Sequence, residues 1–261
     1  MKRIRNWFIP ALALVLVISI LSGCSQNSTA DETAAKELDG HSLFIYCGAG
    51  MTKPFEEITA AFKDETGCQV EVVYANAAQI QNQITTTGEG DLFIAGSSDE
   101  LKPVQDSVAE SLDLVKHIPV LAVQSGNPLG INNLNDLTKD GVEVVLGDGE
   151  ATPIGKIANK ALTDLGILDQ VNVIARAATA PEIFNALSVN ECDAIIVWKE
   201  NVTGSSSEIV ETSDLDAYVK TVPAATLTSA ENTEALTSFL TYLNSDDAKQ
   251  IWQNYGYEVL N

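Results

Sequence analysis

Basic residues are scarce in this sequence. Of its 261 residues, 15 are Lys or Arg against 36 Asp or Glu, which gives a formal net charge of -21. A protein that binds nucleic acid needs a basic surface to neutralise the phosphates, so this balance excludes a nucleic-acid partner. Hydrophobic residues make up 45% of the chain, which is enough for a packed core and too many for a disordered polypeptide.

Histidine and cysteine are also rare. The chain has 2 His and 4 Cys and no CxxC pair, which excludes a structural zinc site and a thioredoxin-type motif. We therefore expect neither a bound metal nor a cofactor. Cys47, Cys68 and Cys192 each lie at the edge of an apolar run, which favours three buried free thiols. One disulfide with one free thiol is the alternative.

The usual nucleotide-binding and catalytic motifs are absent. The segments 48–50 (GAG) and 147–149 (GDG) lack the third glycine of a dinucleotide fingerprint, and the sequence contains neither GK[ST] nor GxSxG. A nucleophilic Cys47 with His41 or His117 as its base is conceivable. Nothing in the sequence brings them together, and a buried thiol is the simpler interpretation. We therefore expect that the protein is not an enzyme.

The N-terminus resembles a bacterial lipoprotein signal. Basic residues within positions 2–5 precede an apolar run over residues 7–20, and Leu21-Ser22-Gly23 then leads to Cys24. In such signals the chain is cleaved before the cysteine, whose thiol is then lipidated. The apolar run is shorter than the ~20 residues that a membrane-spanning helix needs, which argues against the alternative of a transmembrane anchor.

This resemblance predicts the organisation of the N-terminal region. Residues 1–23 are expected to be a signal peptide, Cys24 the lipidated residue, and residues 24–40 a flexible tether of small polar residues. The protein is therefore expected outside the cytoplasm, anchored to the cell membrane through the lipid on Cys24.

From residue 42 onward, short β-branched and aromatic runs alternate with amphipathic segments, which indicates parallel strands joined by helices. Capping residues support the helix ends: Thr52 and Ser245 as N-caps, and Gly67 and Gly256 after C-termini. The expected strands are 42–47, 69–74, 91–95, 142–146, 171–174 and 193–198, with longer extended stretches at 115–124 and 218–227. The expected helices are 53–65, 77–86, one after Asp99, 155–165, 181–190, 230–243 and 246–255.

The two longer extended stretches bracket the central α/β block. This arrangement predicts two lobes joined by a double hinge, the first formed by residues 41–120 plus 222–261 and the second by residues 121–221. Ligands of such folds bind in the cleft that faces the carboxyl ends of the strands.

Small residues fill the turns after these strands. Free N–H groups at a helix start, together with the positive end of the helix dipole, form an anion site that needs no Lys or Arg. Any one of these turns is ordinary strand-to-helix chemistry, but five of them in two lobes favour a binding cleft. The turns are residues 47–52, 75–78, 96–98, 151–155 and 178–181.

The order and spacing of these segments resemble the periplasmic molybdate-binding proteins of ABC importers. The resemblance implies a two-lobed α/β fold of the type II periplasmic-binding class, in which each lobe is a mainly parallel sheet flanked by helices. It also implies a monomer that binds molybdate or tungstate and delivers it to a permease and its ATPase. The matching segments are LFIYCGAGMTKPFEEITAAFKDETG, YANAAQIQNQI, GDLFIAGSSDEL, LGDGEATPIGKIANKALTDLGI, NALSVNECDAIIVW and NYGYEVL.

The resemblance also assigns ligand positions. That family holds its anion with two serine hydroxyls, loop amides and a tyrosine. The serine positions fall on Gly50 and Ala77, the second-lobe amides on Ile154 and Ile183, and the tyrosine on Trp198. Both hydroxyls are therefore absent, and an indole N–H replaces the phenol.

Each lost hydroxyl would cost about 1.5–3 kcal/mol of binding free energy, as for hydrogen bonds to charged groups. The backbone amides of Gly50, Met51, Ala77 and Ala78 remain as donors. Either another side chain supplies the missing hydrogen bonds or the ligand differs from molybdate. The candidate replacements are Asn76, Ser97, Thr152 and Thr179.

The leading hypothesis is therefore a lipid-anchored receptor for a tetrahedral oxyanion. One alternative is a receptor for a different small anion or an organic acid stacked on Trp198, although plain core packing also explains that residue. Another is an enzyme or a sensory module on the same fold, because a fold does not dictate a function. Most of the acidic residues are expected to form a solvated surface, and a minority to pair with the transporter.

Overall fold

The computed structural model describes residues 35–260. The predicted signal peptide, the lipidation site Cys24 and most of the predicted tether lie outside these residues. Among the helices that are described, none is long and apolar enough to cross a membrane.

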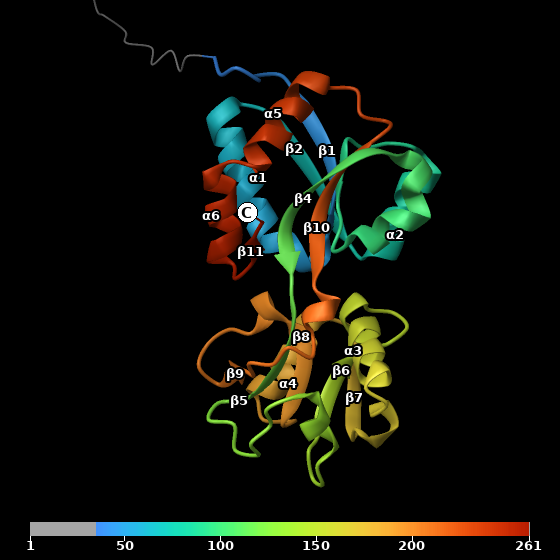
Figure 1. Ribbon diagram of the computed structural model, residues 1–261. Helices are drawn as coiled ribbons and strands as arrows, with labels where there is room; N and C mark the ends of the chain where they lie inside the picture. Colours follow the sequence, from blue (N-terminus) through green and yellow to red (C-terminus); the bar gives the residue numbers. More distant parts are fainter. Residues whose placement is uncertain (1–34, 261) are drawn as a thin grey trace, which may run out of the picture. The chain divides into compact units, whose positions relative to one another are not determined.

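The first lobe contains a six-stranded sheet in the order β11-β4-β10-β3-β1-β2. Its strands are β1 (Ser42–Gly48), β2 (Gln69–Ala75), β3 (Leu92–Ile94), β4 (Val108–His117), β10 (Lys220–Leu227) and β11 (Glu258–Val259). Its helices are η1 (Ala49–Met51), α1 (Thr52–Thr66), α2 (Ala77–Thr87), η2 (Ser98–Ser107), α5 (Thr233–Leu243) and α6 (Asp246–Asn254). Figure 1 shows α1, α5 and α6 on one side of this sheet and α2 on the other.

Each face of the first sheet has its own hydrophobic core. Phe62, Phe239 and Trp252 from α1, α5 and α6 are fully buried in one cluster. Ile80 and Ile84 from α2 are buried in another. Apolar residues at helical spacing thus place these helices on the sheet.

The second lobe contains a five-stranded sheet in the order β7-β6-β8-β5-β9. One mainly aliphatic core holds this sheet and its helices together. The strands are β5 (Pro119–Gln124), β6 (Val144–Gly147), β7 (Val173–Ala177), β8 (Ala194–Trp198) and β9 (Ser207–Ile209). The helices are η3 (Leu134–Thr138), α3 (Pro153–Asp164), η4 (Leu168–Gln170), α4 (Ala180–Ser188), η5 (Lys199–Asn201) and η6 (Asp216–Tyr218).

The predicted two-lobed α/β fold is confirmed, but the sheets are mixed rather than mainly parallel. Strands β1, β2 and β3 are parallel, as are β6, β7 and β8. The connecting strands β4, β5 and β10 and the edge strands β9 and β11 pair antiparallel. Only Ile118 separates β4 from β5, and β10 returns the chain after Val219. These connections lie within the two predicted crossing stretches.

Local capping agrees with the prediction at most positions. Ser245 Oγ accepts from the Ala248 N–H at 3.2 Å, and Gly67 ends α1 at a φ of 84°, a conformation that favours glycine. The N-cap prediction for Thr52 is wrong, because its hydroxyl donates instead to the Ala49 carbonyl at 2.8 Å.

Two further expectations are corrected. The helix expected after Asp99 is the 3-10 helix η2, because Pro103 lacks the N–H that an α-helix needs and Val104 leaves helical geometry. The packed chain also begins before the predicted boundary at residue 41. Leu38 is 1% exposed, and its N–H donates to the Thr66 carbonyl at 2.8 Å.

Candidate functional site

The turn after β1 carries two predicted ligand residues, Gly50 and Met51, which differ in their exposure to solvent. Gly50 is exposed in η1, whereas the Met51 side chain is 2% exposed and belongs to the core. A Cβ atom added at Gly50 would meet nothing within 4 Å. A serine would fit there, so the missing hydroxyl has no steric cause.

Helix α2 begins with an uncharged capping box. Asn76 Oδ1 accepts from the Gln79 N–H at 3.0 Å, and Gln79 Oε1 accepts from the Asn76 N–H at 3.4 Å. The amides of Ala77 and Ala78 have no acceptor within residues 35–260. The positive end of the α2 dipole therefore presents two unused N–H groups.

Helix α4 begins with a capping box that carries a negative charge. Thr179 Oγ1 accepts from the Glu182 N–H at 3.3 Å, and Glu182 Oε2 accepts from the N–H groups of Ala178 and Thr179 at 3.0 and 3.1 Å. Pro181 has no N–H, and the Ile183 N–H donates to the Thr179 carbonyl at 3.2 Å. The predicted Ile183 amide is therefore engaged in its own helix, because it lies beyond the first turn.

At the start of α3, within residues 35–260, Ile154 keeps a free hydrogen-bond donor and Thr152 does not. Thr152 Oγ1 donates to the Asp148 carbonyl at 2.8 Å and accepts from the Gly155 N–H at 3.1 Å. Its only proton is used, so Thr152 cannot replace a lost serine donor. The Ile154 amide has no acceptor in the described part of the chain, although the side chain is buried.

The turn between β6 and α3 also brings together charges that the sequence did not suggest. The Asp148 carboxylate accepts from the N–H groups of Ala151 and Glu150 at 2.9 and 2.8 Å, and these hydrogen bonds lower its pKa. Arg176 and Lys156 are near enough to lower that pKa further. Backbone amides are thus accompanied by two basic side chains in this lobe.

The turn after β3 combines a free hydroxyl with a carboxylate. Ser97 is 6% exposed, and its hydroxyl makes no hydrogen bond in residues 35–260 yet is not fully enclosed. Glu100 Oε2 accepts from the Gly96 N–H at 2.9 Å. Burial raises the pKa of Glu100, and that hydrogen bond opposes the rise.

Trp198, the last residue of β8, packs against His117, the last residue of β4. The His117 and Trp198 rings are stacked, with centroids 3.6 Å apart and planes 20° apart. His117 Nδ1 lies 2.9 Å from the Gly96 carbonyl oxygen, and Nε2 lies 2.8 Å from Glu200 Oε1. One face of Trp198 is therefore covered, which disfavours stacking of an organic acid there. Its indole N–H makes no hydrogen bond to a described residue and is not fully enclosed.

The three cysteines that the structure describes have no catalytic partner among residues 35–260. Cys47, Cys68 and Cys192 are buried free thiols, which confirms the favoured interpretation. Burial raises the pKa of Cys47 well above its usual value. His41 interacts instead with Asn232, and His117 with Gly96 and Glu200. Residues 35–260 also contain no cluster of His, Cys, Asp and Glu that would hold a metal ion.

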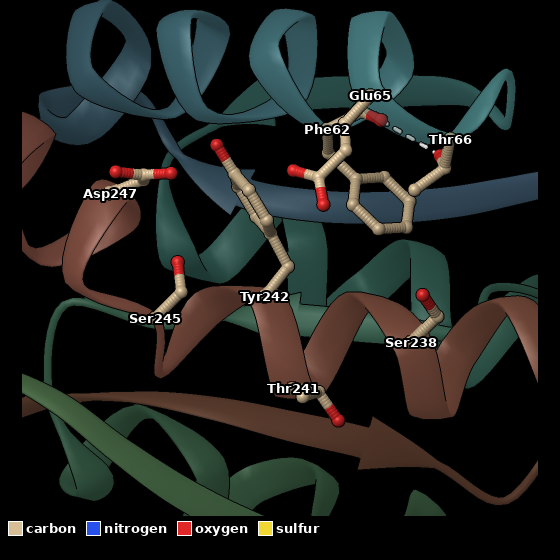
Figure 2. A pocket seen from close by; sticks show the side chains of 8 residues that line it. All are labelled: Phe62, Glu65, Thr66, Ser238, Thr241, Tyr242, Ser245 and Asp247. Atoms are coloured by element: carbon tan, nitrogen blue, oxygen red, sulfur yellow. Dashed lines mark hydrogen bonds between the residues drawn. The ribbon is translucent and has the colours of Figure 1, made fainter.

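A pocket of about 360 Å³ lies between α1 and α5 and is unsuited to an anion. Figure 2 shows the side chains that line it. Glu65 and Asp247 bring carboxylates to it, and no Lys or Arg lines it. Burial raises the pKa of Tyr242, and both carboxylates add to the rise. The lining residues are Phe62, Glu65, Thr66, Ser238, Thr241, Tyr242, Ser245 and Asp247.

A second pocket, of about 550 Å³, lies at the junction of β4 and β5. Its lining combines apolar residues such as Ile118 and Leu121 with the charged residues Lys116, Lys199, Glu211, Asp216 and Glu258. Both lysines pair with Glu258, and Glu211 and Asp216 add further negative charge, which disfavours an anion there.

Sequence reasoning missed Glu100 and Lys156, and it considered His117 only as a base for Cys47. The spacing Ser97-x-x-Glu100 matches a capping box and could have drawn attention to Glu100. The carboxylate in fact accepts from Gly96 rather than from Ser97. His117 and Lys156 carry no such signal, because their roles depend on contacts that are distant in sequence.

Known proteins similar to this chain are bacterial binding proteins. A family model described as bacterial extracellular solute-binding protein matches residues 43–258. A binding protein from Haemophilus influenzae is 33% identical over 161 residues, which is 60% of this chain and 66% of that relative, just under two thirds of its length. The molybdate-binding protein ModA of Escherichia coli is 24% identical over 234 residues, 85% of this chain and 90% of that protein.

A solved structure supports the same fold. The substrate-binding domain assigned to a molybdenum ABC transporter of Clostridium difficile matches with a TM-score of 0.72 at 23% identity. The match covers 84% of this chain and 99% of that domain. At this level of identity the likeness establishes the two-lobed fold and leaves the ligand to be argued from the site.

Proposed function

Because the chain belongs to the bacterial extracellular solute-binding protein family, we propose that it captures a small tetrahedral oxyanion of the molybdate or tungstate type and delivers it to an ABC importer. Its relatives are binding proteins, and it is a binding protein rather than an enzyme. The ligand and the transporter are the proposed part.

The start of α2 carries this proposal. Two unused amides, at Ala77 and Ala78, stand at the positive end of the helix dipole, and the box that caps this helix is uncharged. Ser97 Oγ, the Ile154 amide and the Trp198 indole N–H are further unpartnered donors in the described chain. An anion without a proton of its own needs donors of this kind.

The remaining parts of the proposal concern place and partners. We propose that the mature protein is a monomer tethered to the cell membrane through lipidated Cys24 and that it docks on a permease with its ATPase. One lobe would begin near Leu38 and comprise the residues up to 120 together with 222–261, and residues 121–221 would form the other. The hinge would lie where β4 meets β5 and where β10 returns.

A second candidate is a receptor for a different small anion. The absent hydroxyls at Gly50 and Ala77 favour it, and Thr152 has no proton left to compensate. A ligand with fewer or different acceptor atoms than molybdate would fit this reduced set of donors.

Isothermal titration of the full chain in detergent tests the proposal. Sodium molybdate, tungstate, sulfate and phosphate are titrated separately. We expect saturable one-site binding of at least one of them, and Trp198 provides a fluorescence readout in parallel. Binding of none of the four would overturn the oxyanion proposal, and a panel of organic acids would then test the second candidate.

A further inference from the structure

Glu100 places a carboxylate in the same turn as the proposed ligand residue Ser97. Its Oε2 atom accepts from the Gly96 N–H at 2.9 Å, so the chain's own negative charge already occupies the amide that follows β3. Its Oε1 atom has no hydrogen-bond partner among residues 35–260 and is not fully enclosed. One acceptor of this carboxylate is therefore open to a bound molecule.

The charged groups around Glu100 come from both lobes. Asp99 precedes it in η2, and His117, whose Nδ1 lies 2.9 Å from the Gly96 carbonyl oxygen, approaches the same turn from β4. Lys156, in the first turn of α3, attracts the carboxylate from the second lobe. The charge of Lys156 thus links the Glu100 turn electrostatically to α3, the helix whose Ile154 amide has no acceptor in the described chain.

A carboxylate in this position discriminates between oxyanions by their protons. An ionised carboxylate only accepts hydrogen bonds, so an oxygen that bears no proton is repelled and one that bears a proton is bound. Molybdate, tungstate and sulfate carry no proton at neutral pH, whereas inorganic phosphate keeps at least one. Sites that accept from a ligand O–H strongly reject analogues without it.

We propose that Glu100 selects an oxyanion that carries its own proton, such as hydrogen phosphate or a protonated phosphate ester, over proton-free anions of similar size. The inference rests on the proposed function, since it concerns the same site. It favours the second candidate, a receptor for a different small anion, over molybdate and tungstate, and it names the class of that anion.

The test compares two anions rather than one affinity. The full chain in detergent and its Glu100→Gln variant are titrated with sodium phosphate and with sodium molybdate at about pH 8.5, where inorganic phosphate is almost entirely the dianion and still carries one proton. The parent is expected to bind phosphate at least tenfold more tightly than molybdate. The glutamine keeps an acceptor for the Gly96 N–H and adds an N–H donor, so the ratio of the two affinities should shift toward molybdate by tenfold or more.

The ratio separates proton recognition from simple charge. Hydrogen phosphate and molybdate carry the same charge, so removal of a distant negative charge affects both alike. Glu110→Gln, on an exposed position of β4, is the matched control and should leave the ratio unchanged. Thermal melting verifies that both variants fold.

Each other outcome has a definite meaning. Binding with the same ratio in the parent and Glu100→Gln would overturn the role of Glu100 and leave the proposed function standing, as would a parent that prefers molybdate. Failure of both proteins to bind either anion, or tungstate and sulfate, would overturn the proposed function and this inference with it.

Discussion

Helices α2 and α4 both begin with a capping box, but the two boxes differ in charge and in the number of N–H groups left free for a ligand. Each has a complete capping box, formed by Asn76 with Gln79 in α2 and by Thr179 with Glu182 in α4. In α2 the box is uncharged and the next two amides are unused. In α4 the box is negative, and Pro181 removes one of those amides. A capping box therefore determines where a helix begins, whereas its charge and the remaining N–H groups decide whether an anion binds.

The same contrast extends to the other turns. In the second lobe Asp148 fills the amides before α3, as Glu182 does before α4. That lobe offers the basic side chains Lys156 and Arg176 beside its filled turn. The first lobe also has one filled turn, where Glu100 accepts from the Gly96 N–H, but it keeps the unused amides of α2, and the second lobe adds positive charge.

The largest expected loss of anion affinity comes from placing a proline in α2 at the helical position that Pro181 occupies in α4. Ala78 occupies the same second helical position as Pro181, where proline is tolerated because the first turn needs no N–H. Ala78→Pro removes one unused amide and should weaken anion binding by about 1.5–3 kcal/mol, roughly ten- to hundredfold. Isothermal titration with whichever of the four anions binds the parent measures the loss.

The control for this variant is the reverse change in the other lobe. Pro181→Ala adds an amide beside Glu182 and should leave the affinity nearly unchanged, because that carboxylate already competes for it. Unchanged melting temperatures would show that both helices still form. An Ala78→Pro protein that bound as tightly as the parent would place the ligand away from α2.

A smaller effect is expected from exchanging the charges of the two boxes. Gln79→Glu turns the α2 box into the α4 type and brings a negative charge to the unused amides. Because the side chain is exposed and screened, we expect a loss of about 1 kcal/mol, roughly fivefold, that shrinks in high salt. Glu182→Gln is the matched variant and should change the affinity less. Equal effects of both changes would mean that the two helix starts contribute alike.

Much of the fold could be predicted from the sequence, because hydrophobic periodicity reports directly which face of a segment is buried. The helix predicted at 77–86 is α2, and the strand predicted at 193–198 is β8, nearly to the residue. The misses have local causes. Pro103 converts an expected α-helix into the 3-10 helix η2. Thr52 is not an N-cap, because its hydroxyl donates to the carbonyl of Ala49, three residues earlier.

The site was less predictable. The sequence indicates the turns, but it does not indicate which side chains accept hydrogen bonds from their amides. Small residues before α4 suggested free amides, yet the Glu182 side chain folds back onto two of them. Whether a carboxylate folds back or extends into solvent depends on its rotamer and neighbours. The stacking of His117 on Trp198 depends on the meeting of β4 and β8, which no local pattern encodes.

The smallest expected effect concerns how the stability contributed by Asp148, in the turn before α3, depends on pH. Hydrogen bonds from the amides of Ala151 and Glu150 lower the pKa of Asp148 below its unfolded value, so the folded state favours the ionised carboxylate. Its contribution to stability is then complete above the unfolded pKa of about 4 and is lost as the pH falls through the lower folded value.

Asp148→Asn should therefore lower the melting temperature at pH 7, and the difference from the parent should fade as the medium is acidified below about pH 4. Melting curves across that range measure it, with Glu110→Gln as an exposed control that should follow the parent more closely. A difference that stayed constant with pH would mean that the Asp148 carboxylate is not held by its turn in solution. The amides before α3 would then be open to a ligand, as those of α2 are, and the contrast between α2 and the second lobe would rest on Glu182 alone.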